Sequence, residues 1–207
     1  MTRSVAILDL GMGNLRSVAR ALERVGAAPS VVREPEALGT VERLVVPGQG
    51  HFGDCARALD GALGDAVRAF VATGRPYLGI CLGMQALFAS SEEAPGMAGL
   101  GLFQGTVRRF ETHLHDPRTG ERLKVPHMGW SEIDPAQPTF ARSWFYFVHS
   151  YVCVPDDPSL VAARCEHGGA FCAAVARDNV VAVQFHPEKS GADGHALLAA
   201  YLEGRWS

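Results

Sequence analysis

The chain has 207 residues, 47% of them hydrophobic, which is enough to bury the core of one large domain, and we expect a single domain over residues 1–207. Its 19 basic and 22 acidic residues give a formal net charge of -3, so the charge balance does not favour a nucleic-acid partner. The apolar run that ends before Asp9 is too short for a signal sequence or a membrane span, so we expect a cytoplasmic protein with no membrane association.

Cysteine and histidine spacings give no sign of a metal centre. The five cysteines are odd in number and form no C-x-x-C pair, and the eight histidines show no H-E-x-x-H pattern. Residues 11–16 half resemble a dinucleotide-binding fingerprint, but Arg16 stands where the third glycine should be. We therefore predict no metal and no cofactor.

The first half of the chain alternates between strand and helix patterns. Residues 5–8 are a short apolar run followed by Gly11 and Gly13, which is typical of a buried parallel strand. Asn14 can cap a helix whose apolar face runs to Gly26. The alternation continues with strands near 30–32, 44–46 and 77–80 and a helix near 55–73. This order predicts an α/β fold with a mostly parallel sheet covered by helices.

The second half is richer in strand patterns, with runs near 105–110, 144–148, 161–165, 171–176 and 180–185. Residues 177–179 favour a hairpin turn between the last two runs, so this half should be partly antiparallel. The charged segment 113–122 is typical of a surface loop, or of a contact surface, and a final helix is expected near 193–202.

Cys81 lies in the sharpest local motif, Gly-Ile-Cys-Leu-Gly at 79–83, between an apolar strand and a helix-like segment at 84–88. This is the pattern of a nucleophile elbow, in which small flanking residues allow a tight turn that exposes the central side chain. A helix N-terminus at this position also favours the reactive thiolate. The alternative is an ordinary buried cysteine at a strand end, and the flanking glycines favour the nucleophile.

His186 and Glu188 are the candidate base and orienting acid for Cys81. They follow the apolar run at 180–183, so His186 should emerge at the carboxyl end of a strand, where open parallel sheets place their sites. Two residues apart in extended chain, the carboxylate can hold the imidazole in its working tautomer. A surface ion pair is the alternative, and the presence of Cys81 favours a Cys-His-Glu triad.

Residues 47–50, Pro-Gly-Gln-Gly, follow the strand at 44–46. A glycine-rich loop at this sheet edge could present backbone N–H groups to the oxyanion that forms during amide hydrolysis. The alternative is a simple turn.

Together, the motifs at 79–85, 47–50 and 186–188 resemble the class I glutamine amidotransferases. The resemblance implies a flavodoxin-like, three-layer domain in which Cys81 attacks the side-chain amide of glutamine, releases ammonia and leaves a thioester that water hydrolyses. It also implies that the backbone amides of Gln49 and Leu82 form the oxyanion hole. The residues that it implies for glutamine binding are Gly48, Gly50, Gln85, Glu93, Ser150 and Tyr151.

Further motifs at 124–130, 146–151 and 189–190 are similar to one branch of this family, the glutaminase subunits of imidazole glycerol phosphate synthases. That likeness implies a heterodimer in which ammonia passes to a separate cyclase subunit, a (β/α)8 barrel, which makes imidazole glycerol phosphate and AICAR in histidine biosynthesis. The positions that it implies for the partner interface are Met12, Asn14, Trp130 and Lys189.

Two other functions stay open at this point. The chain could serve another synthase, such as anthranilate or aminodeoxychorismate synthase. It could also be a non-catalytic interaction module, although all three residues of the expected triad are present.

Overall fold

The computed structural model describes residues 3–204, and within them one sheet of twelve strands runs through the whole fold. Five strands form its parallel part, in the order β2-β1-β3-β4-β12. Their bounds are β1 Arg3–Leu8, β2 Ala27–Val32, β3 Leu44–Gly48, β4 Tyr77–Cys81 and β12 Val180–Val183. Because these strands are parallel, their carboxyl ends meet at one edge of the sheet.

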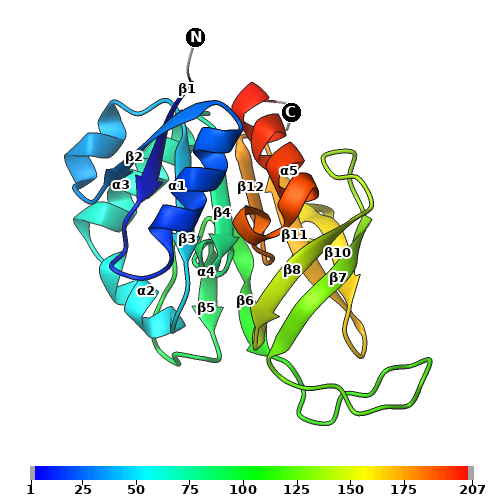
Figure 1. The fold of residues 1–207 in the computed structure, drawn as a ribbon. Helices are drawn as coiled ribbons and strands as arrows, with labels where there is room; N and C mark the ends of the chain where they lie inside the picture. The colour runs from blue at the N-terminus through cyan, green and yellow to red at the C-terminus, as the bar shows by residue number, and fades with distance from the viewer. Residues whose placement is uncertain (1–2, 205–207) are drawn as a thin grey trace.

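Helices cover both faces of the parallel part (Figure 1). On one face lie α1 (Leu15–Arg24) and α5 (Gly191–Glu203), and on the other lie α2 (Phe52–Ala58), α3 (Ala62–Ala72) and the 3-10 turn η1 (Pro35–Gly39). The side chains of β1 alternate between these layers: Val5 and Ile7 pack with α1 and α5, and Ala6 and Leu8 pack with α2 and α3. The order is helix, sheet, helix.

The remaining strands are mostly antiparallel and extend the sheet beyond β12. β11 (Ala170–Arg177), β10 (Val161–Glu166), β7 (His127–Pro135) and β8 (Ser143–His149) follow in that order, and β5 (Phe88–Ser91), β6 (Phe103–Arg109) and β9 (Tyr151–Pro155) form a side branch that joins at β11. The short elements are α4 (Leu82–Gln85), η2 (Pro158–Leu160) and η3 (Pro187–Lys189).

The predicted α/β class, with a parallel part and a partly antiparallel second half, is confirmed. The hairpin at 177–179 is also present: Arg177 pairs with Val180, and Asp178 takes the left-handed backbone (φ 53°) that such turns require. None of the helices in the described residues 3–204 is long and apolar enough to cross a membrane.

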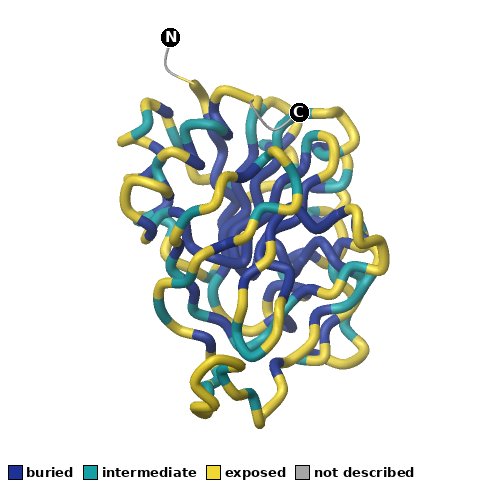
Figure 2. Tube along the Cα trace, turned by 90° about the vertical axis from the view of Figure 1, so that its right-hand side faces the viewer, coloured by how far each residue is buried: buried dark blue, intermediate teal, exposed yellow. Residues whose placement is uncertain are grey.

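Several boundaries differ from the prediction. The helix expected at 55–73 is two helices, because Gly61 (φ 71°) turns the chain between α2 and α3. The helical segment expected at 84–88 is the single turn α4, and Phe88 already begins β5. The prediction contained no strand at β7 or β9: β7 begins inside the motif at 124–130, and β9 begins at the last residue of the motif at 146–151. The segment 110–126 between β6 and β7 projects as a mostly exposed loop, whereas the trace at the centre of the sheet is buried (Figure 2).

Candidate active site

Cys81 ends β4, and α4 begins at the next residue. Its backbone lies at φ 55° and ψ -107°, a left-handed conformation that costs a residue other than glycine about 1–3 kcal/mol. The sharp turn leaves the side chain 8% exposed at the carboxyl edge of the sheet. This is the strand-turn-helix geometry that the glycine-flanked motif predicts.

The two flanking glycines are required by close backbone contacts. A Cβ atom on Gly83 would lie 1.8 Å from the carbonyl oxygen of Val46, and a Cβ atom on Gly79 would lie 2.7 Å from the carbonyl oxygen of Gly83. Both distances are far below van der Waals contact. The motif therefore has small residues because α4 starts directly against β3 and β4.

His186 and Glu188 lie beside the elbow, at the end of β12. The Nδ1 atom of His186 is 2.8 Å from Oε1 of Glu188, and both side chains are almost completely buried. The His186 backbone N–H donates to the carbonyl oxygen of Tyr146 at 2.9 Å, which ties the backbone of His186 to β8. The structure thus brings together the three side chains of the expected triad.

The electrostatics of His186 favour its charged form. Burial by itself lowers the pKa of His186, but hydrogen bonding and charge from Cys81 and Glu188 outweigh burial and raise the pKa to about 9. Among the described residues, Nε2 of His186 forms no hydrogen bond, and the interaction of the ring with Cys81 is one of the causes that raise its pKa. At neutral pH the ring is an imidazolium with Nε2 available for proton transfer.

The loop after β3 lies directly beside Cys81. Gly48, the last residue of β3, pairs with Cys81 across the two strands, and Gly50 adopts φ 131°, which favours glycine. A Cβ atom on Gly13 would lie 3.4 Å from the backbone nitrogen of Gln49, so the β1–α1 loop packs against this segment. Leu82 opens α4, where the first N–H groups of a helix have no partner within it. The predicted oxyanion donors, the amides of Gln49 and Leu82, therefore flank the nucleophile.

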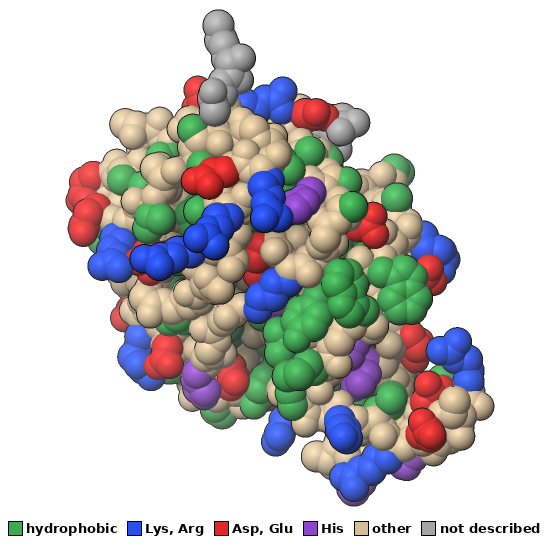
Figure 3. All heavy atoms as spheres, viewed as in Figure 1, with side chains coloured by type: hydrophobic (Ala, Val, Ile, Leu, Met, Phe, Trp, Pro, Cys, Tyr) green, Lys and Arg blue, Asp and Glu red, His purple; other side chains and the backbone are tan. Residues whose placement is uncertain are grey.

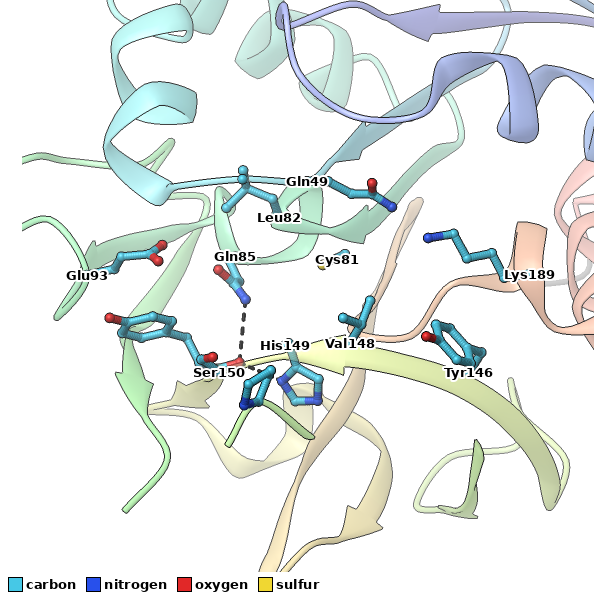
Figure 4. A pocket seen from close by; sticks show the side chains of 13 residues that line it. Gln49, Cys81, Leu82, Gln85, Glu93, Tyr146, Val148, His149, Ser150 and Lys189 are labelled. Atoms are coloured by element: carbon cyan, nitrogen blue, oxygen red, sulfur yellow. Dashed lines mark hydrogen bonds between the residues drawn. The ribbon is translucent and has the colours of Figure 1, made fainter. Parts of the chain in front are cut away.

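A cavity of about 430 Å³ opens in front of Cys81 (Figure 4). Nine residues singled out from the sequence line it: Gln49, Gly50, Cys81, Leu82, Gln85, Glu93, Ser150, Tyr151 and Lys189. Gly48, His186 and Glu188 are not among the residues that line the cavity. Four further residues, which sequence reasoning had not assigned to the cavity, complete the wall: Pro126, Tyr146, Val148 and His149. They come from β8 and from the loop before β7, two regions whose pairing the sequence did not reveal.

Glu93 links the cavity to the loop after β3. Its Oε2 atom accepts the backbone N–H of Phe52, the first residue of α2, at 2.7 Å. A carboxylate at a helix N-terminus is favourable because it satisfies a free donor and faces the positive end of the helix dipole. The same carboxylate lines the cavity. Glu93 therefore holds Phe52, the residue that follows the segment 49–51, and also faces the space in front of Cys81.

Two buried histidines support the floor of the cavity. Nδ1 of His149 is 2.8 Å from the carbonyl oxygen of Tyr151, so that nitrogen carries the proton. Nε2 of His149 then accepts from Nδ1 of His127 at 3.2 Å, and Nε2 of His127 accepts from the hydroxyl of Ser131 at 2.9 Å. Burial lowers the pKa of His127 to about 4 and that of His149 to about 3, in agreement with this neutral chain.

An apolar face lies next to the cavity on the outer side of β7 and β8. We define the β7–β8 face as Met128, Trp130, Trp144, Tyr146 and Val148. Met128 is 63% exposed, and Trp130 and Trp144 are each 53% exposed. Figure 3 shows hydrophobic side chains gathered in this part of the molecule. Lys189 lies at its border, with Nζ 5.9 Å from the ring centre of Tyr146.

The family model for class-I glutamine amidotransferase matches residues 6–202, nearly the whole chain. The chain belongs to this family. It is 48% identical over 210 residues to the imidazole glycerol phosphate synthase subunit HisH of Dechloromonas aromatica, covering 97% of this chain and 96% of that protein. It is 49% identical to the HisH subunit of Methylococcus capsulatus, covering 98% and 96%. Within the class I amidotransferases, the chain therefore groups with the HisH subunits.

Solved structures support the fold of this amidotransferase. A crystal structure of a glutamine amidotransferase superposes with a TM-score of 0.74 at 24% identity, covering 97% of this chain and 98% of that one. The structure of PurLQS from Thermotoga maritima superposes with a TM-score of 0.76 at 18% identity over the full length of both chains. Both superpositions extend over nearly the whole chain, so they support the fold of the antiparallel extension as well as that of the parallel part.

Proposed function

We propose that this class I amidotransferase is the glutaminase subunit of an imidazole glycerol phosphate synthase. It hydrolyses glutamine to glutamate and ammonia through a thioester on Cys81 and delivers the ammonia to a cyclase subunit. The observation that carries the proposal is the near full-length identity of 48–49% with HisH subunits. The arrangement of Cys81, His186 and Glu188 beside one cavity supports the chemistry.

In the first step, the sulfur of Cys81 attacks the side-chain carbonyl carbon of glutamine, and the amide oxygen becomes an oxyanion. We assign the backbone amides of Gln49 and Leu82 as its hydrogen-bond donors, and losing one such donor typically costs about 3 kcal/mol of transition-state stabilisation. The imidazolium of His186 gives its Nε2 proton to the leaving nitrogen. The carbon–nitrogen bond breaks, ammonia leaves, and a glutamyl thioester remains on Cys81.

In the second step, the now neutral His186 accepts a proton from water through Nε2 while the water oxygen attacks the thioester carbonyl. The carbon–sulfur bond breaks, the thiolate and imidazolium are restored, and glutamate leaves as its new carboxyl group releases a proton to the solvent. Glu188 keeps the proton on Nδ1 throughout, so Nε2 is always the nitrogen that faces the reaction.

Glutamine binding falls to the polar groups around the cavity. We assign Glu93 as the partner of the α-ammonium group, because its carboxylate lines the cavity, and we assign Gln85 and residues 150–151 as further polar contacts of the substrate. Gly50 lines the cavity with open space beside its Cα, so the substrate can approach the backbone there, whereas Gly48 leaves room for the side chain of Leu82, whose Cβ would lie 2.8 Å from a Cβ on Gly48.

The β7–β8 face is the proposed docking surface for the cyclase. Exposed tryptophans beside a cavity are unusual on a free surface and are natural anchors in an interface. Met12 and Asn14 lie in the loop that packs against Gln49, so a partner that contacts this loop would also influence the oxyanion donors. Lys189 joins the two areas at the cavity mouth. We place the complex in the cytoplasm, where reducing conditions suit a reactive thiol.

The first experiment measures ammonia release from glutamine by the chain alone and with a cognate cyclase subunit plus its nucleotide ligand. We expect hydrolysis that depends on Cys81, that the cyclase stimulates, and that Cys81→Ala abolishes while ammonia-dependent synthesis by the complex continues. Hydrolysis without stimulation would contradict the assigned pathway. Absence of hydrolysis in every condition would contradict the glutaminase itself.

Docking is tested separately by titrating the cyclase with Trp130→Ala. Truncating a central aromatic anchor costs more than about 1.4 kcal/mol, so we expect at least tenfold weaker binding. Val31→Ala is the control, because Val31 is also 53% exposed but lies on β2, at the other end of the sheet. Equal affinities of the two variants would refute this choice of surface.

A further inference from the structure

Gln184 is a buried polar residue that contacts the nucleophile directly. It follows β12, and its side chain is completely buried. Its Nε2 atom donates to the sulfur of Cys81 at 3.6 Å, and its Oε1 atom accepts from Nε2 of Gln85 at 3.1 Å. The mechanism described above gives this residue no role.

The direction of these hydrogen bonds is fixed by a backbone carbonyl at the other end of the chain of contacts. The carbonyl oxygen of Tyr151 can only accept, and it lies 3.5 Å from Nε2 of Gln85 (Figure 4). The nitrogen of Gln85 therefore faces both Tyr151 and Gln184, which requires the oxygen of Gln184 to face Gln85. The amide nitrogen of Gln184 must then face the sulfur. Reversing any amide in this chain would set donor against donor or acceptor against acceptor.

We propose that Gln184 is a positioning residue that stabilises the Cys81 thiolate with its amide N–H, and that Gln85 sets the orientation of Gln184. This proposal rests on the glutaminase function proposed above. A buried anion needs donors to replace the water that it has lost, and a neutral amide supplies one without adding charge. The imidazolium of His186 and the amide of Gln184 then stabilise the same sulfur by different means.

The arrangement also connects the substrate site to the nucleophile. Gln85 lines the cavity, and both N–H groups of its amide are used by Tyr151 and Gln184. Its Oε1 atom is thus the one left to accept a hydrogen bond from bound glutamine. A substrate that engages Gln85 therefore contacts the same hydrogen-bond chain that ends on the attacking sulfur.

The test is the pH dependence of alkylation of Cys81 by iodoacetamide in the full chain, because only the thiolate reacts. Burial raises the pKa of Cys55, Cys165 and Cys172 to about 12 and also raises that of Cys153, so Cys81 should react selectively, as peptide mapping by mass spectrometry can check. In Gln184→Met, which keeps the side-chain length but removes the donor, we expect the midpoint to rise by about one pH unit. Below the midpoint, this shift means roughly tenfold slower alkylation.

Gln184→Glu is the second variant, to be used if the methionine variant does not fold, because the glutamate side chain has nearly the same shape as glutamine. Its carboxylate would repel the thiolate, so we expect a rise at least as large. Gln104→Met is the matched control, because Gln104 is exposed on β6. Profiles of both Gln184 variants that superimpose on the wild-type profile would overturn the proposal. Alkylation needs neither glutamine nor a partner, so its result is independent of the proposed glutaminase function. If the wild-type protein hydrolyses glutamine and the Gln184 variants show no shift in the alkylation profile, the role of Gln184 alone is refuted. If the variants show the shift but the wild-type protein has no glutaminase activity, the role of Gln184 is supported and the proposed function is refuted.

Discussion

Replacing Glu188 by glutamine should move the upper pH limit of the reaction. The carboxylate accepts a charge-assisted hydrogen bond from Nδ1 of His186 at 2.8 Å in a fully buried setting. Such a bond contributes about 1.5–3 kcal/mol, and one pKa unit corresponds to about 1.4 kcal/mol. Glu188→Gln should therefore lower the pKa of His186 from about 9 by roughly one to two units. Because formation of the thioester needs the imidazolium, activity should be lost at a correspondingly lower pH.

The assay is kcat/KM for ammonia release between pH 6 and 10, with the cyclase subunit present. We expect the alkaline limb of the profile to move from near pH 9 to between about 7 and 8, and the smaller imidazolium fraction then lowers kcat/KM at pH 8 by roughly 2- to 10-fold. Glu42→Gln is the control, since Glu42 is an exposed carboxylate whose partner is Arg43 and it lies away from the β7–β8 face. An alkaline limb that stays in place in a folded Glu188→Gln protein would refute the assignment of His186 as the titrating group.

Three further results are expected. Gly83→Ala should destabilise the protein by at least about 2 kcal/mol in urea denaturation, because its Cβ would lie 1.8 Å from the Val46 carbonyl oxygen, whereas Gly39→Ala, with open space around it, should change little. The free energy of unfolding should fall as pH drops below 6.5, because the pKa values of His127 (about 4) and His149 (about 3) are lowered in the folded protein and the unfolded chain therefore binds protons first. His127 alone should account for a loss of roughly 3 kcal/mol between pH 7 and pH 4. An unfolding free energy that stays constant from pH 7 to 4 would contradict this. Glu93→Gln should raise KM for glutamine about tenfold or more with a smaller change in kcat, while its neighbour Glu92→Gln, whose carboxylate holds the Arg109 backbone, should leave KM unchanged.

The sequence predicted the parts of this protein that depend on local pattern. The elbow at Cys81 and the hairpin at Asp178 need particular residues at particular positions, and both are present. The split at Gly61 was missed because a single glycine in an apolar periodic stretch does not reveal a turn. Gln184, His149 and Tyr146 could not be assigned from spacing, since their positions depend on which strands pair. β12 lies between β4 and β11, and that long-range pairing places Gln184 against Cys81.

The place of β12 at the centre of the sheet has a consequence for biosynthesis. Gln184 and Cys81 are 103 positions apart, and β12 inserts between β4 and β11, both made before it. While roughly half of the chain is made, between Cys81 and Val180, the nucleophile is therefore present with an unpaired β4 edge and without its base. Contacts of such long range are slow to form, and an open strand edge invites pairing with other chains. Because Val180–Val183 closes the edge of β4 and His186 and Glu188 follow it directly, the same segment completes the sheet and the catalytic apparatus.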